Sequence, residues 1–243
     1  MGVEAHGPTW GRGNGDAGVG RVRDVLTPRE AVPEWLRGCW RRVSIDFADG
    51  SGNLTDTVYW LQTDSAMVDV RIASGRPSFA GVTSFEQCSP AQRAALATTN
   101  ASTGFTTATD VMTHADGTHS CVAQWFTYGY GVNFQPECQY PEPGLLTVDA
   151  AGAVMIERAP SGTYEEEWHR VPGSHDGPLS ATVLDDGRHL FVAGPIAVLV
   201  RDRSSAEELD CEFSVALRDG DGVYRIQVST LPWREGAPLD APL

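Results

Sequence analysis

The sequence predicts an all-β protein, an antiparallel up-and-down β-barrel of about ten to twelve strands with one or two short helices. Short runs rich in Val, Ile, Thr and aromatic residues follow one another from residue 41 to residue 230, separated by turns rich in Asp and Gly. A strong helix signal is confined to one segment, and the chain shows neither strand–helix–strand units nor a repeat of fixed period. A closed barrel hides its strand edges most completely, and a two-sheet sandwich is the competing architecture.

The chain divides into a short leader and one domain. Residues 1–26 are rich in Gly and lack hydrophobic periodicity, so we expect a disordered leader. Residues 27–243 are expected to form a single barrel domain. At its start, Thr27 and Pro28 have the residue types of a helix cap and a first helical position, which predicts a short helical turn before Pro33.

The strands follow in order along the domain. They are expected at 41–47, 56–62, 67–72, 105–113, 118–128, 145–148, 154–158, 164–171, 179–184, 189–192, 209–218 and 224–230, and a short apolar run lies at 196–200. Between the third and fourth of these runs, Ser89 is the expected N-cap of a helix that begins at Pro90 and ends near Asn100. The last two runs alternate apolar and polar residues, which is typical of a strand pair that covers a core on one side.

Charge and composition exclude several classes of protein. The net charge is −14, and all 18 basic residues are arginine. Such an acidic chain is not expected to bind nucleic acid or anionic membranes, and the absence of lysine removes Schiff-base chemistry. The N-terminal residues lack the apolar segment of a signal peptide, and no apolar run is long enough to span a membrane. We therefore expect a cytoplasmic protein.

Cysteine and histidine spacing predicts neither a disulfide framework nor a metal site. The five cysteines are widely spaced, without a C-x-x-C pair. The six histidines show neither H-x-H nor H-E-x-x-H spacing. No phosphate-binding or dinucleotide-binding loop follows a predicted strand, so we expect no cofactor.

The segment Pro33-Glu34-Trp35-Leu36-Arg37-Gly38-Cys39-Trp40 resembles the first strand of calycins, the superfamily of lipocalins, fatty-acid-binding proteins and nitrobindins. In that superfamily a helical turn leads into G-x-W. The resemblance implies that Gly38 allows a tight bend, that Trp40 closes the floor of the barrel, and that a late arginine stacks on this tryptophan. Arg225 is the matching candidate for that arginine.

Three further segments, 58–62, 69–72 and 164–168, look similar to uncharacterised lipocalin-like proteins of bacteria and fungi, and this similarity implies no activity. Nitrobindin-like barrels hold haem through a single histidine. The resemblance therefore leaves a haem protein as a minor alternative, with His169 or His189 as the ligand.

The strand expected at 164–171 has a mixed aromatic and ionisable face. Tyr164, Glu166, Trp168 and Arg170 lie on one face, as in the wall of a polar cavity. Glu166 and Arg170 are candidates to contact a ligand, with Glu166 as a general base whose pKa is raised by burial. The alternative is a structural ion pair across neighbouring strands.

Asp69 and Arg71 share one face of the strand expected at 67–72, and valines occupy the other. If the valine face packs outward against a covering element, Asp69 and Arg71 point into the barrel, where arginine suits a ligand carboxylate. In the more usual pattern the valines form the core and the two charged residues face water. The sequence leaves both alternatives open.

Several aromatic and polar residues are candidates for contact with a ligand, because aromatic rings in a barrel can stack on a planar molecule. More often such aromatic residues simply belong to the core. The candidates are Trp60, Gln62, Trp125, Tyr128, Phe134, Tyr164 and Trp168.

These observations predict a barrel that holds a small hydrophobic or aromatic metabolite. In the first hypothesis it is a cofactor-independent enzyme of the cyclase, isomerase or dehydratase type, with Asp69, Arg71, Glu166 and Arg170 as catalytic candidates. In the second it is a non-catalytic carrier or sensor, with an apolar lumen. The expected partner is a small organic ligand or substrate, and a homodimer stays open beside a monomer.

Overall fold

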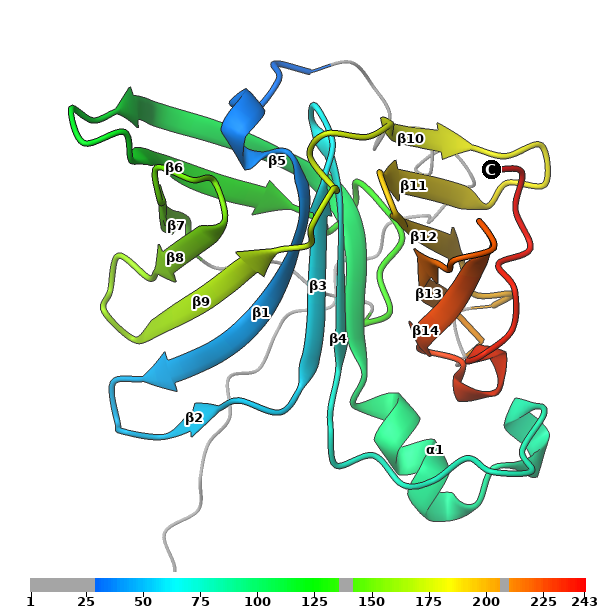
Figure 1. Ribbon diagram of the computed structural model, residues 1–243. Coiled ribbons are helices and arrows are strands. Elements are labelled where there is room, and N and C mark those ends of the chain that lie inside the picture. The colour runs from blue at the N-terminus through cyan, green and yellow to red at the C-terminus, as the bar shows by residue number, and fades with distance from the viewer. Residues whose placement is uncertain (1–28, 136–141, 206–209) are drawn as a thin grey trace, which may run out of the picture.

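The protein is an eight-stranded antiparallel barrel with a separate five-stranded sheet packed on its outside. The computed structural model describes residues 29–135, 142–205 and 210–243. The barrel closes because the last strand of the series, β9, pairs back with the first, β1 (Figure 1). The barrel strands are β1 (Gly38–Phe47), β3 (Thr57–Gln62), β4 (Ala66–Ile72), β5 (Asn100–Thr113), β6 (His119–Phe126), β7 (Gly144–Val148), β8 (Val154–Arg158) and β9 (Tyr164–Arg170). The predicted all-β, antiparallel up-and-down barrel is confirmed.

The remaining strands form a meander of their own. They are β10 (Leu179–Val183), β11 (His189–Ala193), β12 (Ile196–Arg201), β13 (Glu212–Arg218) and β14 (Tyr224–Ser229). The short strand β2 (Gly52–Asn53) pairs with the end of β1. We expected about ten to twelve strands in one barrel, whereas the described chain places eight in the barrel and five in the second sheet.

An apolar layer joins the barrel to the second sheet, and we call it the interface cluster. Strand β4 supplies Val68 and Val70, and the second sheet supplies Phe191, Val198 and Phe213. All five side chains are essentially inaccessible to solvent. Because side chains alternate along a strand, this contact turns the other face of β4, with Asp69 and Arg71, toward the inside of the barrel. The second sheet is therefore the covering element that the inward orientation of Asp69 and Arg71 required.

The inside of the barrel has an apolar cluster of its own at one end. It consists of the buried residues Val32, Leu36, Trp40, Val58, Trp60, Met67, Cys121, Ala123, Trp125, Leu146, Val148, Met155 and Trp168. Four of these are tryptophans, whose large rings fill much of the width of an eight-stranded barrel.

The floor of the barrel is closed by the G-x-W segment and by an arginine from β9. Gly38 has φ +115°, a conformation that favours glycine, and an added Cβ would lie 3.0 Å from a guanidinium nitrogen of Arg170. The Arg170 guanidinium lies 4.0 Å from the ring centroid of Trp40. It also donates to the backbone carbonyls of Trp35, Arg37 and Gly152.

The prediction that Arg225 stacks on Trp40 is therefore wrong. Arg225 lies on β14 and pairs with Asp219 in the neighbouring turn, 2.8 Å away. Arg170 takes the position instead, because β9 is the strand that closes the barrel beside β1 and brings its end to Trp40.

The predicted helix is confirmed as α1 (Pro90–Ala97), with Ser89 as N-cap in a reciprocal capping box with Gln92. The helical turn expected near Thr27 and Pro28 lies partly outside the described residues. A 3₁₀ turn is present later, at Glu34–Leu36. The expected leader at 1–26 also lies outside the described residues.

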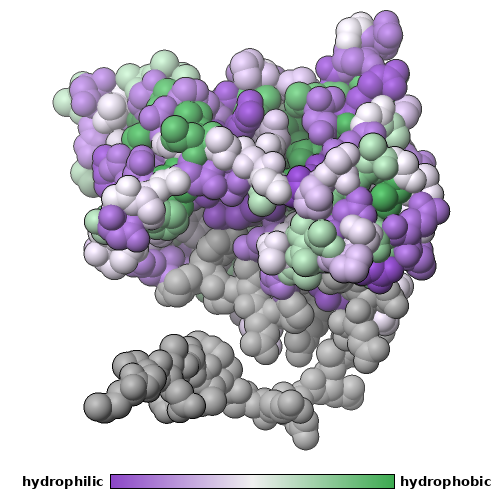
Figure 2. Space-filling view, turned by 90° about the horizontal axis from the view of Figure 1, so that it is seen from below, coloured by the Kyte–Doolittle hydropathy of each residue, from purple (hydrophilic) through white to green (hydrophobic). Residues whose placement is uncertain are grey.

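The surface of one end of the molecule is mostly hydrophilic. Viewed from below, hydrophilic residues dominate both the barrel and the second sheet, with small hydrophobic patches among them (Figure 2). Among the helices in the described ranges, none is both long and apolar enough to cross a membrane. Of the cysteines, Cys39, Cys88, Cys121 and Cys211 are buried and free.

The floor contacts predict that Arg170 contributes strongly to stability. Substitution Arg170→Ala removes three hydrogen bonds from a charged donor and the stacking on Trp40, so we expect a loss of at least about 3 kcal/mol in the free energy of unfolding. The matched control Arg225→Ala breaks one surface ion pair and should cost less than about 1 kcal/mol. Urea denaturation measures both. Equal losses would contradict the assignment of the floor arginine.

Candidate functional site

A cavity of ≈ 290 Å³ lies inside the barrel. This volume is at the lower end of the range for sites that enclose a small molecule. The lining residues come from strands all around the barrel and from the loop before β7. They are Ile45, Phe47, Trp60, Met67, Asp69, Arg71, Trp125, Glu142, Glu157, Tyr164, Glu166 and Trp168.

Three tryptophans form the apolar wall. Trp60 is 5.8 Å from Trp125 and 6.3 Å from Trp168 between ring centroids, and both pairs are edge-to-face. Gly144 on β7 makes room for this wall, because an added Cβ would lie 2.5 Å from the Trp125 ring and 3.2 Å from Cγ of Glu157. The wall therefore offers ring surfaces to a planar or hydrophobic molecule.

A network of ion pairs spans three strands at the polar side of the cavity. Arg42 Nη1 on β1 is 2.6 Å from Glu166 Oε1 on β9, and both side chains are more than nine-tenths buried. On β4, Arg71 Nε is 2.7 Å from Asp69 Oδ1, and Arg71 Nη1 is 3.9 Å from Glu166 Oε1. Breaking a buried pair leaves one charge uncompensated, so the network holds these side chains in place.

The sequence left open a structural ion pair of Glu166 across neighbouring strands. The structure contains this ion pair, between β1 and β9. Arg71 is also engaged, through two contacts with the carboxylate of Asp69 at 2.7 and 3.3 Å. A ligand carboxylate would have to compete with Asp69 for this guanidinium.

Glu157 has a different environment from Glu166, its cross-strand partner on β9. It accepts a hydrogen bond from the hydroxyl of Tyr164, with an oxygen–oxygen distance of 2.9 Å. Burial, with the nearby Glu166 carboxylate, raises the pKa of Glu157 to about 8, although Arg71 opposes the shift. Burial and the Glu157 carboxyl, which accepts its hydrogen bond, raise the pKa of Tyr164 as well.

This arrangement is suited to proton transfer. Two carboxyl groups face the same cavity, and one of them contacts two guanidinium groups while the other keeps its proton at neutral pH. Such a separation of environments is how enzymes divide acid and base roles between carboxyl groups. A group that titrates near neutral pH can both donate and accept a proton there.

Most of the predicted site residues line the cavity. Those that do are Asp69, Arg71, Glu166, Trp60, Trp125, Tyr164 and Trp168. Arg170, the fourth catalytic candidate, lies instead at the floor, with its guanidinium committed to Trp40 and three carbonyls.

The other predicted ligand contacts lie elsewhere. Gln62 is buried and hydrogen-bonds Thr106, 2.6 Å away. Phe134 packs in the interface cluster, outside the barrel. Tyr128 is 49% exposed, beyond the end of β6. Gln62 lies at the end of β3, and Tyr128 and Phe134 lie in the loop after β6. At these positions the alternation of side chains along a strand no longer predicts where a side chain points.

Sequence reasoning missed Glu157, although its strand carried a signal. Met155 and Glu157 share the inward face of β8, but Val154 and Ile156 on the outward face are equally apolar and hide the alternation. It also missed Arg42, because a register shift between Arg42 and Ser44 breaks the alternation of β1. Ile45, Phe47, Met67 and Glu142 were not predicted either.

The two histidines named as haem ligands do not line the cavity. The side chain of His169 is 51% exposed and lies 2.7 Å from Glu167. His189 lies on β11, in the second sheet, where burial lowers its pKa. Within the described ranges, His, Cys, Asp and Glu side chains form no group of three or more that could hold a metal ion.

No protein-family model, curated protein or solved structure matches this chain.

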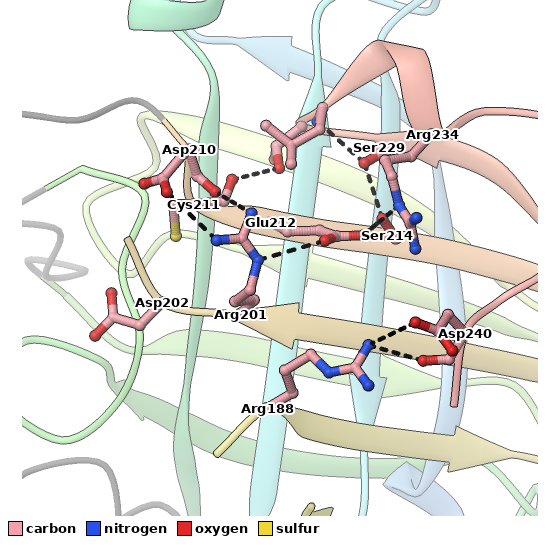
Figure 3. A network of polar contacts seen from close by, with 12 residues as sticks. Arg188, Arg201, Asp202, Asp210, Cys211, Glu212, Ser214, Ser229, Arg234 and Asp240 are labelled. Atoms are coloured by element: carbon pink, nitrogen blue, oxygen red, sulfur yellow. Dashed lines mark hydrogen bonds and ion pairs between the residues drawn. The ribbon is translucent and has the colours of Figure 1, made fainter. Parts of the chain in front are cut away.

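A second polar network lies on the five-stranded sheet (Figure 3). The buried carboxylate of Glu212 accepts from Ser214 at 2.7 Å and from Arg234 at 3.0 Å, and Arg201 lies 3.7 Å away. Ser214 in turn contacts Ser229 on β14. These groups are satisfied by one another and line none of the barrel cavity, so we assign them to the cohesion of β12, β13, β14 and the following turn.

The raised pKa of Glu157 predicts a pH-dependent stability. The folded protein keeps the Glu157 proton above pH 4.5, the ordinary pKa of the group, whereas the unfolded chain releases it. The stability contributed by this carboxyl is therefore lost as pH rises from about 4.5 toward about 8. We expect the urea midpoint of Glu157→Gln, which cannot ionise, to fall less over this range than that of the wild type. Glu165→Gln, on the outward face of β9, is the control and should follow the wild type. If the urea midpoints of all three proteins fell equally with pH, Glu157 would not be the group with the raised pKa.

Proposed function

We propose that the barrel binds a small hydrophobic or aromatic metabolite and acts on it by cofactor-independent acid–base chemistry, of the cyclase, isomerase or dehydratase type. The observation that carries this proposal is the pair of carboxyl groups, Glu157 and Glu166, in unlike environments at one cavity inside the barrel. All three reaction types move protons within a bound molecule and need no redox group.

In this proposal Glu157 is the group that exchanges a proton with the substrate. Its hydrogen bond with Tyr164 fixes the carboxyl at the cavity wall. The ion pairs of Arg42 and Arg71 with Glu166 and Asp69 keep charge close to the reacting region. These fixed charges stabilise charge that develops on the substrate without waiting for water to reorganise. The tryptophan wall holds the substrate in one orientation.

We further propose that the barrel is of the calycin type. The support is its closed eight-stranded up-and-down topology, the Gly38-Cys39-Trp40 segment on β1, and an arginine stacked on that tryptophan. The five-stranded sheet is an addition to such a barrel.

Proton transfer in the cavity can be tested with 5-nitrobenzisoxazole, a planar aromatic probe. A base removes its C3 proton, the ring N–O bond breaks, and the electron pair leaves on oxygen as a coloured cyanonitrophenolate. We expect turnover to rise with pH as Glu157 ionises near pH 8, and to fall about 100-fold in Glu157→Gln, because that substitution removes the base.

The control for this experiment is Glu165→Gln, which should keep the wild-type rate. Binding of the probe is followed separately by its quenching of tryptophan fluorescence. A wild-type rate no higher than that of Glu157→Gln, with the probe bound, would refute the catalytic proposal and leave a carrier or sensor.

A further inference from the structure

The cavity carries more acidic than basic groups. Its lining contains the carboxyl groups of Asp69, Glu142, Glu157 and Glu166. In the described part of the chain, the guanidinium groups that reach these carboxylates from the barrel wall are those of Arg42 and Arg71. Inside a low-dielectric enclosure such an imbalance creates a field that favours positive charge.

The two arginines are already shared between two of the acids. Arg42 pairs with Glu166 at 2.6 Å, and Arg71 pairs with Asp69 at 2.7 Å. At the rim, Glu142 accepts hydrogen bonds from the backbone N–H and the hydroxyl of Ser161. Glu157 makes no ion pair within the described residues and accepts its hydrogen bond from a neutral hydroxyl. Among the described residues it is the buried acid of the cavity that has no ion-pair partner.

The apolar wall is equally suited to a cation. Trp60, Trp125 and Trp168 all line the cavity, and tryptophan is the aromatic ring that attracts cations most strongly. Three indole rings around one cavity, next to an acid that has no ion pair among the described residues, form the kind of surroundings in which organic ammonium groups bind.

We propose that the ligand is an aromatic amine, with its ring among the tryptophans and its ammonium group beside Glu157. This inference rests on the proposed binding of a small aromatic molecule and specifies its chemical class. An anionic ligand would meet the excess of acids and an arginine that Asp69 already holds, and a neutral ligand would gain nothing from the field of these acids.

Binding of the cation is coupled to release of a proton. The groups that face Glu157 are Glu166 and Tyr164 from β9, Asp69 and Arg71 from β4, and Arg42 through its pair with Glu166. Burial and Glu166 favour the neutral acid, whose pKa is about 8. An ammonium group at contact favours the carboxylate, so the acid loses its proton as the amine binds. Affinity for the amine therefore increases as pH rises toward 8.

Three indoles that differ chiefly in the charge of the side chain test this proposal: tryptamine as the cation, tryptophol as the neutral alcohol and indole-3-acetate as the anion. Isothermal titration calorimetry near pH 7, in two buffers of different ionisation enthalpy, measures affinity and protons released. We expect tryptamine to bind at least about tenfold more tightly than the other two, with release of nearly one proton. Its affinity should also increase about 20-fold from about pH 6 to about pH 7.5, as release of one proton from a group with a pKa of about 8 requires.

The outcomes separate this inference from the function on which it rests. Tighter binding of tryptophol or indole-3-acetate, or tryptamine binding without proton release, would overturn the amine inference and leave binding of an aromatic molecule intact. Failure of all three indoles to bind at millimolar concentration would overturn both.

A matched pair of variants locates the proton. Glu157→Gln should lower the affinity for tryptamine at least about tenfold and abolish proton release, while tryptophol binding stays within about twofold of the wild type. Glu165→Gln, whose side chain is about half exposed and pairs with Arg158 outside the barrel, should change neither. Proton release that persists in Glu157→Gln would refute the role of this residue.

Discussion

The apolar contact between the second sheet and the outer faces of β3, β4 and β5 is the constraint on which the rest of the structure depends. An ordinary antiparallel barrel exposes one face of each strand to water, so its apolar side chains point inward. Here Val68, Val70 and Phe213 belong to a core outside the barrel. Burial of one such side chain is worth about 1.5–3 kcal/mol, so reversing β4 would cost far more than its charged face could regain in water.

The inward position of Asp69 and Arg71 follows from this contact, and the chemistry of the cavity follows from their position. Closure of β9 on β1 brings Glu166 to Arg42, and the floor contact of Arg170 with Trp40 keeps that closure in place. Glu157 then lies beside a carboxylate that already has its counter-charges. Its neutral form is thus a consequence of enclosure by the whole barrel, which no local segment of the chain encodes.

Much of this arrangement could be predicted from the sequence where alternation is regular. The inward face of Tyr164, Glu166 and Trp168 could be predicted because these residues occupy alternate positions of β9, and both Tyr164 and Trp168 fall on that face. The second sheet was not separated from the barrel, because the strands of both have the same composition and turn spacing. Glu157 and Arg42 were missed for local reasons, an apolar outward face on β8 and a register shift in β1. Arg225 was preferred to Arg170 as the arginine that stacks on Trp40. The correct choice depends on which strand closes the barrel beside β1, and the sequence pattern does not identify that strand.

The protonation state of Glu157 is the most direct report on whether the polar strand faces are enclosed. Infrared spectroscopy of protein labelled with carbon-13 at the glutamate carboxyl groups resolves protonated from ionised side chains. We expect a protonated carboxyl band at neutral pH that titrates near pH 8 and is missing in Glu157→Gln. Complete ionisation of the glutamates at neutral pH, or a protonated band that survives this substitution, would contradict the account.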